Sequence, residues 1–187
     1  MFHIARLLLA AGLVLAIGRV GNAAEPFMLT SPAFKDGTML AVKNAGNNKS
    51  NPNCVGENVS PPLAWKDAPH ETKSFALLMF DPEGRGGLGV SHWVAYGIPA
   101  SVTGFAEGEV SKPSDKYVGG QSLVKLPHYF GPCTPPGTDV YHYTFTLIAT
   151  DLDPKALPPG LTREELLEKH NGHAKAAAGL VGLFKKP

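Results

Sequence analysis

Two short apolar runs, separated by a glycine-rich segment, form the clearest hydrophobic pattern in the chain. The first run covers residues 75–80 and ends at Asp81, and the second covers residues 93–96 and directly follows His92. Short runs that are rich in aromatic and branched residues and bounded by proline or glycine are typical of buried strands. We predict two strands joined by a loop, with Asp81 and His92 at one edge. Because a charged group at the end of an apolar strand needs a partner, the pair is either a structural hydrogen bond or the floor of a site.

A third strand is predicted for residues 140–150, where the side chains alternate. One face carries Tyr141, Tyr143, Phe145, Leu147 and Ala149 and is the core face, while the other carries His142, Thr144, Thr146 and Ile148. Tyr143 is therefore expected to point inward and His142 outward. The same rule groups His92 with Val94, Tyr96 and Ile98, and it is compatible with His92 and Tyr143 sharing an inner face.

The C-terminal part is predicted to be helical. Thr162 and Glu165 form the pattern of a capping box, which predicts a helix over residues 163–169. A second, alanine-rich helix is predicted over residues 173–184, after Asn171-Gly172. Since the chain also contains 17 prolines and 21 glycines, we predict a mainly β, loop-rich domain with two short C-terminal helices and no internal repeat.

The first 23 residues have the pattern of a signal peptide. Arg6 precedes an apolar stretch over residues 7–17, and the small residues at positions 21–24 predict cleavage after Ala23 or Ala24. Residues 24–187 would then form a single domain. Gly18-Arg19 interrupts the apolar stretch before the roughly 20 residues that a membrane-spanning helix needs. We therefore expect a periplasmic or secreted protein with no stable membrane span after cleavage.

Export also bears on the two cysteines, Cys54 and Cys133. In an oxidising compartment they are expected to form one disulfide, the alternative being two buried thiols. The formal net charge of the 187 residues is +1, and no cluster of lysine and arginine is interleaved with aromatic residues. This charge pattern excludes nucleic acid as an expected partner.

Several segments in series resemble one known family. They are SPPLAW at residues 60–65, TKSFALLMFDPE at 72–83, SHWVAYGIPA at 91–100, YFGPCTPPGT at 129–138, YHYTFTLIATDLD at 141–153, and the C-terminal stretch that begins TREELLEKH. This series resembles the phosphatidylethanolamine-binding protein family, and within it the bacterial Raf kinase inhibitor-like branch, over residues 27–184. The resemblance implies two antiparallel β-sheets packed face to face, helices near the C-terminus and a small anion-accepting pocket.

The resemblance also assigns the pocket residues. It implies a ligand site formed by Asp81, Pro82, His92, Gly131, Pro132 and Tyr143, with a cis peptide bond before Pro82. The sequence departs from the family pattern at the rim of this pocket. Glu83 and Arg85 stand where the family usually has aspartate and proline, and Tyr141 stands where many members have histidine. Glu83 and Tyr141 are kept as candidate ligand residues.

Three functions fit these residues. A histidine held by a carboxylate, together with a tyrosine hydroxyl, could bind a phosphate, a carboxylate or a phospholipid head group. Binding should be tighter at mildly acidic pH, because ionised Asp81 would repel an anion.

The alternatives are an inhibitor or interaction protein that acts through its surface, and a hydrolase that uses His92. For the hydrolase, Ser91 is adjacent to His92 on a strand and should face the other way. The spacing of the histidines and acids matches no metal site, and no cofactor is expected.

Overall fold

The computed structural model describes residues 25–137 and 139–187, and the predicted signal peptide lies outside them. Strands β2, β9, β8, β4, β5 and β7 follow one another in a six-stranded sheet, and β1, β3 and β6 form a smaller sheet. The strands are β1 (Met28–Thr30), β2 (Thr38–Met39), β3 (Leu63–Lys66), β4 (Ser74–Asp81), β5 (Val90–Pro99), β6 (Gly104–Phe105), β7 (Val118–Gly119), β8 (Tyr141–Thr150) and β9 (Ala174–Phe184). Two short α-helices, α1 (Gly84–Gly87) and α2 (Arg163–His170), and the 3-10 helix η1 (Val42–Asn44) complete the fold.

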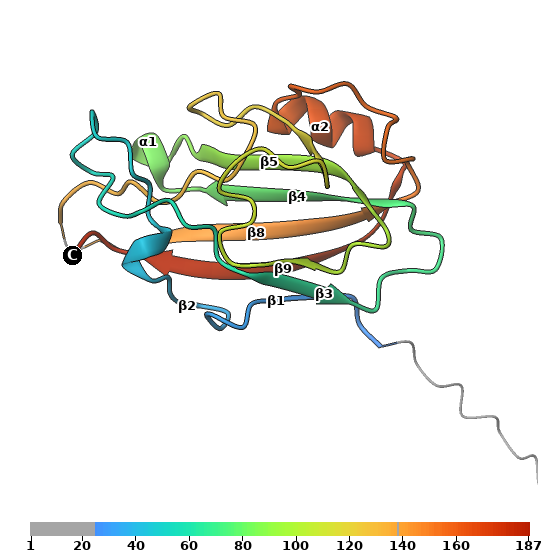
Figure 1. Cartoon of the computed structure of the whole chain (residues 1–187), viewed down its shortest axis with the longest axis horizontal. Coiled ribbons are helices and arrows are strands. Elements are labelled where there is room, and N and C mark those ends of the chain that lie inside the picture. The colour runs from blue at the N-terminus through green and yellow to red at the C-terminus, as the bar shows by residue number, and fades with distance from the viewer. Residues whose placement is uncertain (1–24, 138) are drawn as a thin grey trace, which may run out of the picture.

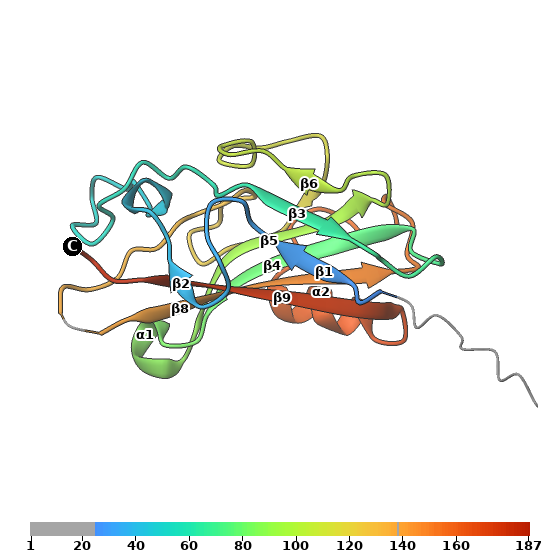
Figure 2. The same cartoon turned by 90° about the horizontal axis from the view of Figure 1, so that it is seen from below.

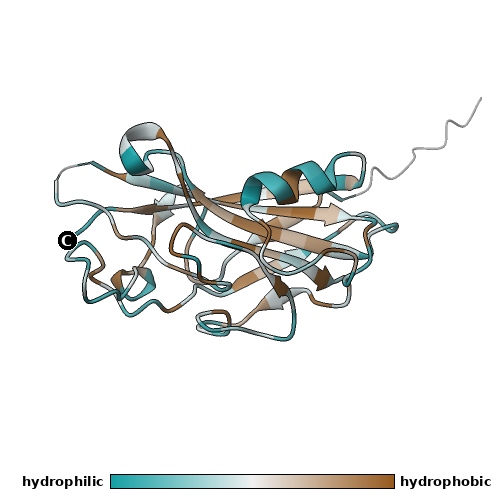
Figure 3. Cartoon of the chain, turned by 90° about the horizontal axis from the view of Figure 1, so that it is seen from above, coloured by the Kyte–Doolittle hydropathy of each residue, from teal (hydrophilic) through white to brown (hydrophobic). Residues whose placement is uncertain are grey.

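The large sheet is the middle layer of the molecule. The small sheet covers one of its faces and α2 covers part of the other, as Figures 1 and 2 show. Apolar residues follow the central strands, whereas much of α2 is hydrophilic (Figure 3). This layering explains why β4 is one continuous apolar run: Leu77 and Met79 belong to the core between the sheets, while Ala76 and Leu78 pack with Leu166 of α2. The prediction of a mainly β fold with two packed sheets is confirmed.

Strand β8 alternates as predicted. Its core face contributes Tyr143, Phe145, Leu147 and Ala149 to the cluster between the sheets, and Tyr141 packs against this cluster at the strand's start. His142 is exposed on the opposite face. Tyr143 and His142 therefore lie on opposite sides of the sheet, as the alternation of side chains along the strand predicts.

Strand β5 departs from simple alternation next to His92. Met79 pairs with Trp93, but Phe80 pairs with Ser91, so β5 carries one extra residue at His92. Such a β-bulge locally re-aims side chains. As a result, His92 lies against Tyr143, with ring centroids 5.0 Å apart, while Trp93 also joins the core between the sheets.

The predicted grouping of His92 with three later residues of β5 is therefore wrong. Val94 and Tyr96 pack on the side of α2. Ile98 returns to the core between the sheets after a second register shift, between Phe75 and Leu77 of β4. Only the meeting of His92 with Tyr143 is confirmed.

The second C-terminal helix is also wrong, because residues 174–184 form strand β9. This strand is antiparallel to β8, from the pair Tyr141 and Phe184 to the pair Thr150 and Ala174. Alanine favours a helix in isolation, but every second residue near the strand's end, including Leu180 and Phe184, is buried in the core. Pairing along β8 therefore outweighs the local propensity.

The other predicted C-terminal helix is confirmed as α2. The Thr162 hydroxyl accepts a hydrogen bond from the backbone N–H of Glu165 at 3.2 Å, and Oε2 of Glu165 accepts one from the N–H of Thr162 at 2.9 Å. These reciprocal bonds form the predicted capping box.

A disulfide between Cys54 and Cys133 confirms the predicted pairing and joins two loops that are 79 residues apart in sequence. The two loops are also in close backbone contact near the disulfide. A Cβ atom on Gly131 would collide with the carbonyl oxygen of Asn44, and the N–H of Gly46 donates to the Pro132 carbonyl at 2.8 Å. This contact fixes the segment that precedes β8.

Candidate functional site

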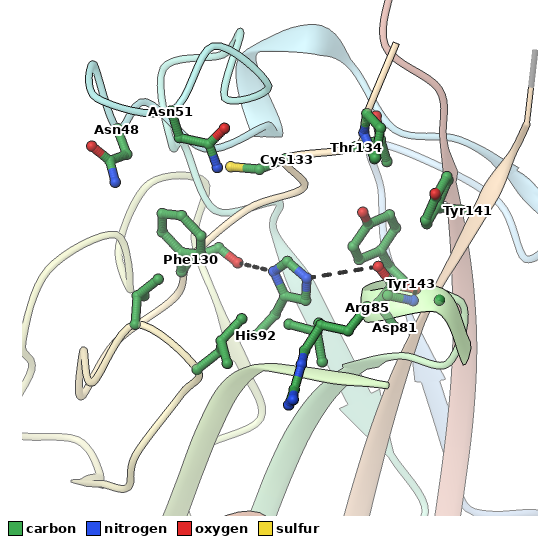
Figure 4. Close-up of a pocket in the computed structure, with 16 residues that line it drawn as sticks. Asn48, Asn51, Asp81, Arg85, His92, Phe130, Cys133, Thr134, Tyr141 and Tyr143 are labelled. Atoms are coloured by element: carbon green, nitrogen blue, oxygen red, sulfur yellow. Dashed lines mark hydrogen bonds and ion pairs between the residues drawn. The ribbon is translucent and has the colours of Figure 1, made fainter. Parts of the chain in front are cut away.

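A pocket of about 310 Å³ opens where β4 ends and where β5 and β8 begin. Because β4 is antiparallel to both neighbours, its last residue, Asp81, meets the first residues of β5 and β8. Figure 4 shows the side chains of Asp81, His92 and Tyr143 converging there. The apolar part of the lining includes Val90, Leu123, Val124, Phe130, Pro135 and Tyr141, and exposed polar residues at its mouth include Asn48 and Arg85.

Asp81 is buried and has one oxygen committed to the backbone. Its Oδ1 accepts hydrogen bonds from the N–H groups of Glu83 and Gly84, both at 2.9 Å. Its Oδ2 lies 4.0 Å from Nε2 of His92. Burial raises the pKa of Asp81 to about 6, although the N–H of Gly84 opposes the shift. Asp81 is thus a carboxyl group that changes charge at mildly acidic pH.

His92 is held in one orientation. Its Nδ1 lies 2.9 Å from the carbonyl oxygen of Phe130. Since a carbonyl only accepts, Nδ1 carries the proton and donates it. Burial lowers the pKa of His92 to about 4, so the ring is neutral at physiological pH. Its Nε2 then offers a lone pair to the pocket.

Tyr143 supplies a hydroxyl group that keeps its proton. The residue is 1% exposed, and burial together with the charge of Asp81 raises its pKa above the usual range. A neutral phenol can donate one hydrogen bond and accept others. The pocket therefore combines this donor, the lone pair of His92 and the titratable oxygen of Asp81.

Sequence reasoning missed Asn58, which positions the carbonyl that holds His92. Its Nδ2 donates to the Tyr129 carbonyl at 3.1 Å, and its Oδ1 accepts from the Gly131 N–H at 2.8 Å. The two bonds lie on either side of Phe130. Asn58 is buried and has a positive φ of 59°, a conformation for which asparagine is enriched. The asparagine-rich character of residues 44–58 was the one available signal.

Thr134 is a second residue of the pocket that the sequence did not single out. It lines the pocket and is 2% exposed. Within the described residues, its hydroxyl oxygen is buried without a hydrogen-bond partner. Such unsatisfied groups are uncommon in proteins and call for an explanation.

The structure separates the predicted ligand residues into two groups. Asp81, His92, Tyr141 and Tyr143 line the pocket. Pro82, Glu83, Gly131 and Pro132 are not in its lining: Pro82 is exposed, whereas Gly131 and Pro132 are buried in the loop that supports Phe130. The peptide bond before Pro82 is trans, contrary to the implied cis bond.

Glu83 turns toward His142 on the outer face of β8. Its Oε1 lies 2.8 Å from Nδ1 of His142, and its Oε2 accepts from the backbone N–H of His142 at 3.1 Å. Burial acts to raise the pKa of Glu83, but these bonds from His142 lower it overall. Glu83 thus ties the α1 turn to β8.

Ser91 does not share a pocket with His92. It lines a neighbouring cleft, while His92 lines the pocket described above.

Within residues 25–137 and 139–187, no group of three or more histidine, cysteine, aspartate or glutamate side chains is placed to hold a metal ion. In the same residues no helix has the length and apolar character that crossing a membrane requires.

Comparison with known proteins gives consistent relatives. A protein designated UPF0098 from Methanothermobacter thermautotrophicus is 36% identical over 148 residues, which cover 78% of this chain and 95% of the relative. A Mycobacterium tuberculosis protein named as the lipoprotein LppC is 36% identical over 166 residues, 87% of this chain and 74% of the relative.

Two solved structures share the fold. Escherichia coli YbcL, described as a member of the mammalian PEBP family, superposes with a TM-score of 0.76 at 27% identity and covers 85% of this chain and 98% of YbcL. A phosphatidylethanolamine-binding protein homolog from Chlamydia trachomatis, CT736, gives a TM-score of 0.73 at 32% identity, with coverage of 86% and 98%. The family model for phosphatidylethanolamine-binding proteins matches residues 30–185. This chain therefore belongs to the phosphatidylethanolamine-binding protein family.

Proposed function

We propose that the protein is a binding protein whose pocket takes a small anionic group of the phosphate or carboxylate class. The observation that carries the proposal is the convergence of Asp81, His92 and Tyr143 in one pocket, with Asp81 titrating near pH 6. A carboxyl group that is protonated donates a hydrogen bond, so Asp81 changes from a repelling charge to a donor as the pH falls.

Each group has a role in this proposal. Protonated Asp81 and the Tyr143 hydroxyl donate to the oxygens of the anion. The Nε2 lone pair of His92 accepts from a hydroxyl of the same group, for example the P–OH of a monoanionic phosphate. The unpartnered Thr134 hydroxyl at the pocket wall supplies a further donor once a side-chain rotation exposes it. Binding therefore takes up close to one proton on Asp81 above about pH 6, where the free carboxyl is ionised, and little below it.

The walls favour a ligand with an organic substituent. A phosphate ion fills only part of a pocket of about 310 Å³, and the remaining lining is largely apolar, including Phe130, Val90 and Tyr141. Burial of apolar surface adds to binding at roughly 25 cal/mol per Å². A phosphomonoester, an organic acid or a phospholipid head group fits this combination better than a free inorganic ion.

We further propose that the protein acts outside the cytoplasm. The Cys54–Cys133 disulfide is typical of an oxidising compartment, and one relative is named a lipoprotein. Periplasmic localisation or secretion through the predicted signal peptide accords with both. Modulation of a partner protein, surface-based inhibition and hydrolysis through His92 remain predictions from the sequence.

The test is a titration of the ¹⁵N-labelled protein with inorganic phosphate and with acetate, followed by NMR. We expect saturable shifts at the backbone amides of Gly84, His92 and Gly131, and weaker binding in Tyr143→Phe. Tyr117→Phe is the matched control, because its buried hydroxyl has no hydrogen-bond partner among the described residues and lies outside the pocket lining. If neither anion shifts these amides between about pH 5 and pH 7, the proposal is wrong.

A further inference from the structure

A second cleft lies beside the pocket and shares part of its wall. Its volume is about 540 Å³, and it is bounded by α1, the start of β5, residues 121–125 and the start of α2. Arg85, Val90 and Leu123 line both the pocket and this cleft. The cleft is therefore adjacent to the pocket, but the buried group of Asp81, His92 and Tyr143 is not part of it.

Basic residues dominate the charged lining of the cleft. Arg85, Lys125 and Arg163 face one acidic residue, Glu164. Glu164 contacts Arg163 at 3.3 Å, and its side chain is 74% exposed, so it offsets only part of the positive charge. In the portion of the chain that the structure describes, Arg85 and Lys125 form no ion pair.

One of the three basic side chains is held by an aromatic ring. Arg85 and Lys125, which line the cleft from its two bordering turns, have positive φ values of 55° and 60°, which are uncommon for residues with side chains. The guanidinium of Arg163 lies 4.5 Å from the centroid of the Phe80 ring, a cation–π contact that fixes its side chain.

Two sets of polar groups at the cleft have unused hydrogen-bonding capacity. The Oγ atom of Ser91 is buried and has no hydrogen-bond partner among the described residues. At the start of the eight-residue helix α2, Oε2 of Glu165 accepts from the N–H and the hydroxyl of Thr162, so a carboxylate already lies there, and only the first N–H groups of the helix lack an intrahelical acceptor. Donors and positive charge thus meet at one place.

We propose that this cleft is a second anion-binding site that takes a dianionic phosphomonoester group. Arg85 and Lys125 would contact the phosphate from opposite borders, Ser91 would donate its buried hydroxyl after a side-chain rotation, and Arg163 would add charge at the helix start. The inference does not depend on occupancy of the pocket. Because Arg85 borders both sites, its loss should weaken both.

The two sites should respond to pH in opposite directions. A phosphomonoester gains its second charge near pH 6, so the cationic cleft should bind it more tightly as the pH rises. The pocket should bind it more tightly as the pH falls, because Asp81 must be protonated. Binding in the cleft should also weaken with salt, since Arg85 and Lys125 are exposed.

The experiment is an NMR titration of the ¹⁵N-labelled protein with glycerol 2-phosphate at about pH 5.5 and about pH 7.5, on either side of the second ionisation. We expect saturable shifts at the amides of Ser91, Lys125 and Glu164, with tighter binding at the higher pH. Absence of saturable shifts there at both pH values would overturn the proposal, whatever happens at the pocket amides of Gly84 and Gly131.

Three variants separate the sites. Lys125→Asn tolerates the positive φ and should weaken binding at the cleft about fivefold, the upper range for an exposed charge, without changing the pocket. Arg85→Asn should weaken both sites. Lys155→Asn is the control, since Lys155 is exposed and outside the cleft. Equal effects of Lys125→Asn and Lys155→Asn would show a general charge effect and contradict the site.

Discussion

The Nε2 atom of His92 lies 4.0 Å from Oδ2 of Asp81, which is longer than a hydrogen bond. The interpretation in which the acid and the histidine simply satisfy each other at a strand end therefore does not hold. The backbone holds each of them separately, Asp81 through Glu83 and Gly84 and His92 through Phe130. Each thus keeps a polar atom turned toward the pocket.

Replacing Asp81 by asparagine should stabilise the protein, and more so at neutral than at acidic pH. The folded state raises the pKa of Asp81 from 3.8 to about 6, so the stability from this group is fully present below about pH 4 and is lost as the pH rises through 6. At about pH 7.5 the ionised Asp81 carboxylate lowers the free energy of unfolding by up to roughly 3 kcal/mol. The asparagine side chain would keep the Oδ1 acceptor and remove this cost.

Urea unfolding of both proteins at about pH 4 and about pH 7.5 tests this linkage. The comparison between proteins is needed because the lowered pKa of His92 acts the other way, making both less stable as the pH falls from about 6.5 to 4. A difference in unfolding free energy between Asp81→Asn and wild type that is the same at both pH values would refute the shifted pKa.

Asn58 should be a determinant of both stability and anion affinity. Asn58→Gly removes two buried hydrogen bonds and should lower the unfolding free energy by about 2 to 4 kcal/mol. Asn58→Ala should cost about 1 kcal/mol more, because alanine is strained at a φ of 59°. Both variants should also weaken phosphate binding, since Phe130 loses its support.

Denaturant titrations, with Asn47→Gly as control, measure these effects. Asn47 is exposed, and its side chain makes one long hydrogen bond, at 3.4 Å, to Glu57. Wild-type phosphate affinity in a folded Asn58→Gly protein would show that Phe130 is positioned by other contacts.

The disulfide should contribute substantially to stability. In the chain-entropy model, linking residues 79 apart stabilises the folded state by roughly 4 to 5 kcal/mol. The double variant Cys54→Ser and Cys133→Ser should lose about this much in urea unfolding, and wild-type protein in reductant should behave alike. If reduction leaves the unfolding midpoint unchanged, the bond does not constrain the unfolded chain as proposed.

Glu83 should matter little for ligand binding. Because it faces His142 rather than the pocket, Glu83→Gln should leave phosphate affinity within about twofold and lower stability by less than about 1 kcal/mol, as for other exposed pairs. Calorimetric titration of Glu83→Gln with phosphate, run in parallel with Arg85→Asn, compares the two affinities. A tenfold loss of phosphate affinity in Glu83→Gln would show that Glu83 does take part in binding.

The sequence was most informative where local pattern and tertiary structure agree. Apolar runs predicted β4 and β5, and parity on β8 placed Tyr143 inside and His142 outside. The bulge at His92 has no local signature, because it depends on the register with β4. Likewise, the alanine-rich segment became β9 through its pairing with β8, which local helix propensity could not reveal.

The three residues that converge in the pocket could be predicted from the sequence, but the residue that positions the Phe130 carbonyl could not. Asp81, His92 and Tyr143 follow from strand ends, parity and family resemblance. Asn58 could not be found in this way, because its two partners are 71 and 73 residues away in sequence and only the folded loop brings them together. The orientation of Glu83 depends in the same way on the position of His142.

The central claim is that the pocket binds an anion only with Asp81 protonated. Its most direct test is the phosphate affinity of wild type and Asp81→Asn, measured by calorimetry from about pH 5 to pH 7.5; the ratio of the two affinities removes the titration of phosphate itself. We predict that wild type loses affinity relative to Asp81→Asn by about tenfold per pH unit above 6, as the competent fraction falls. A ratio that stays constant over this range would contradict the account.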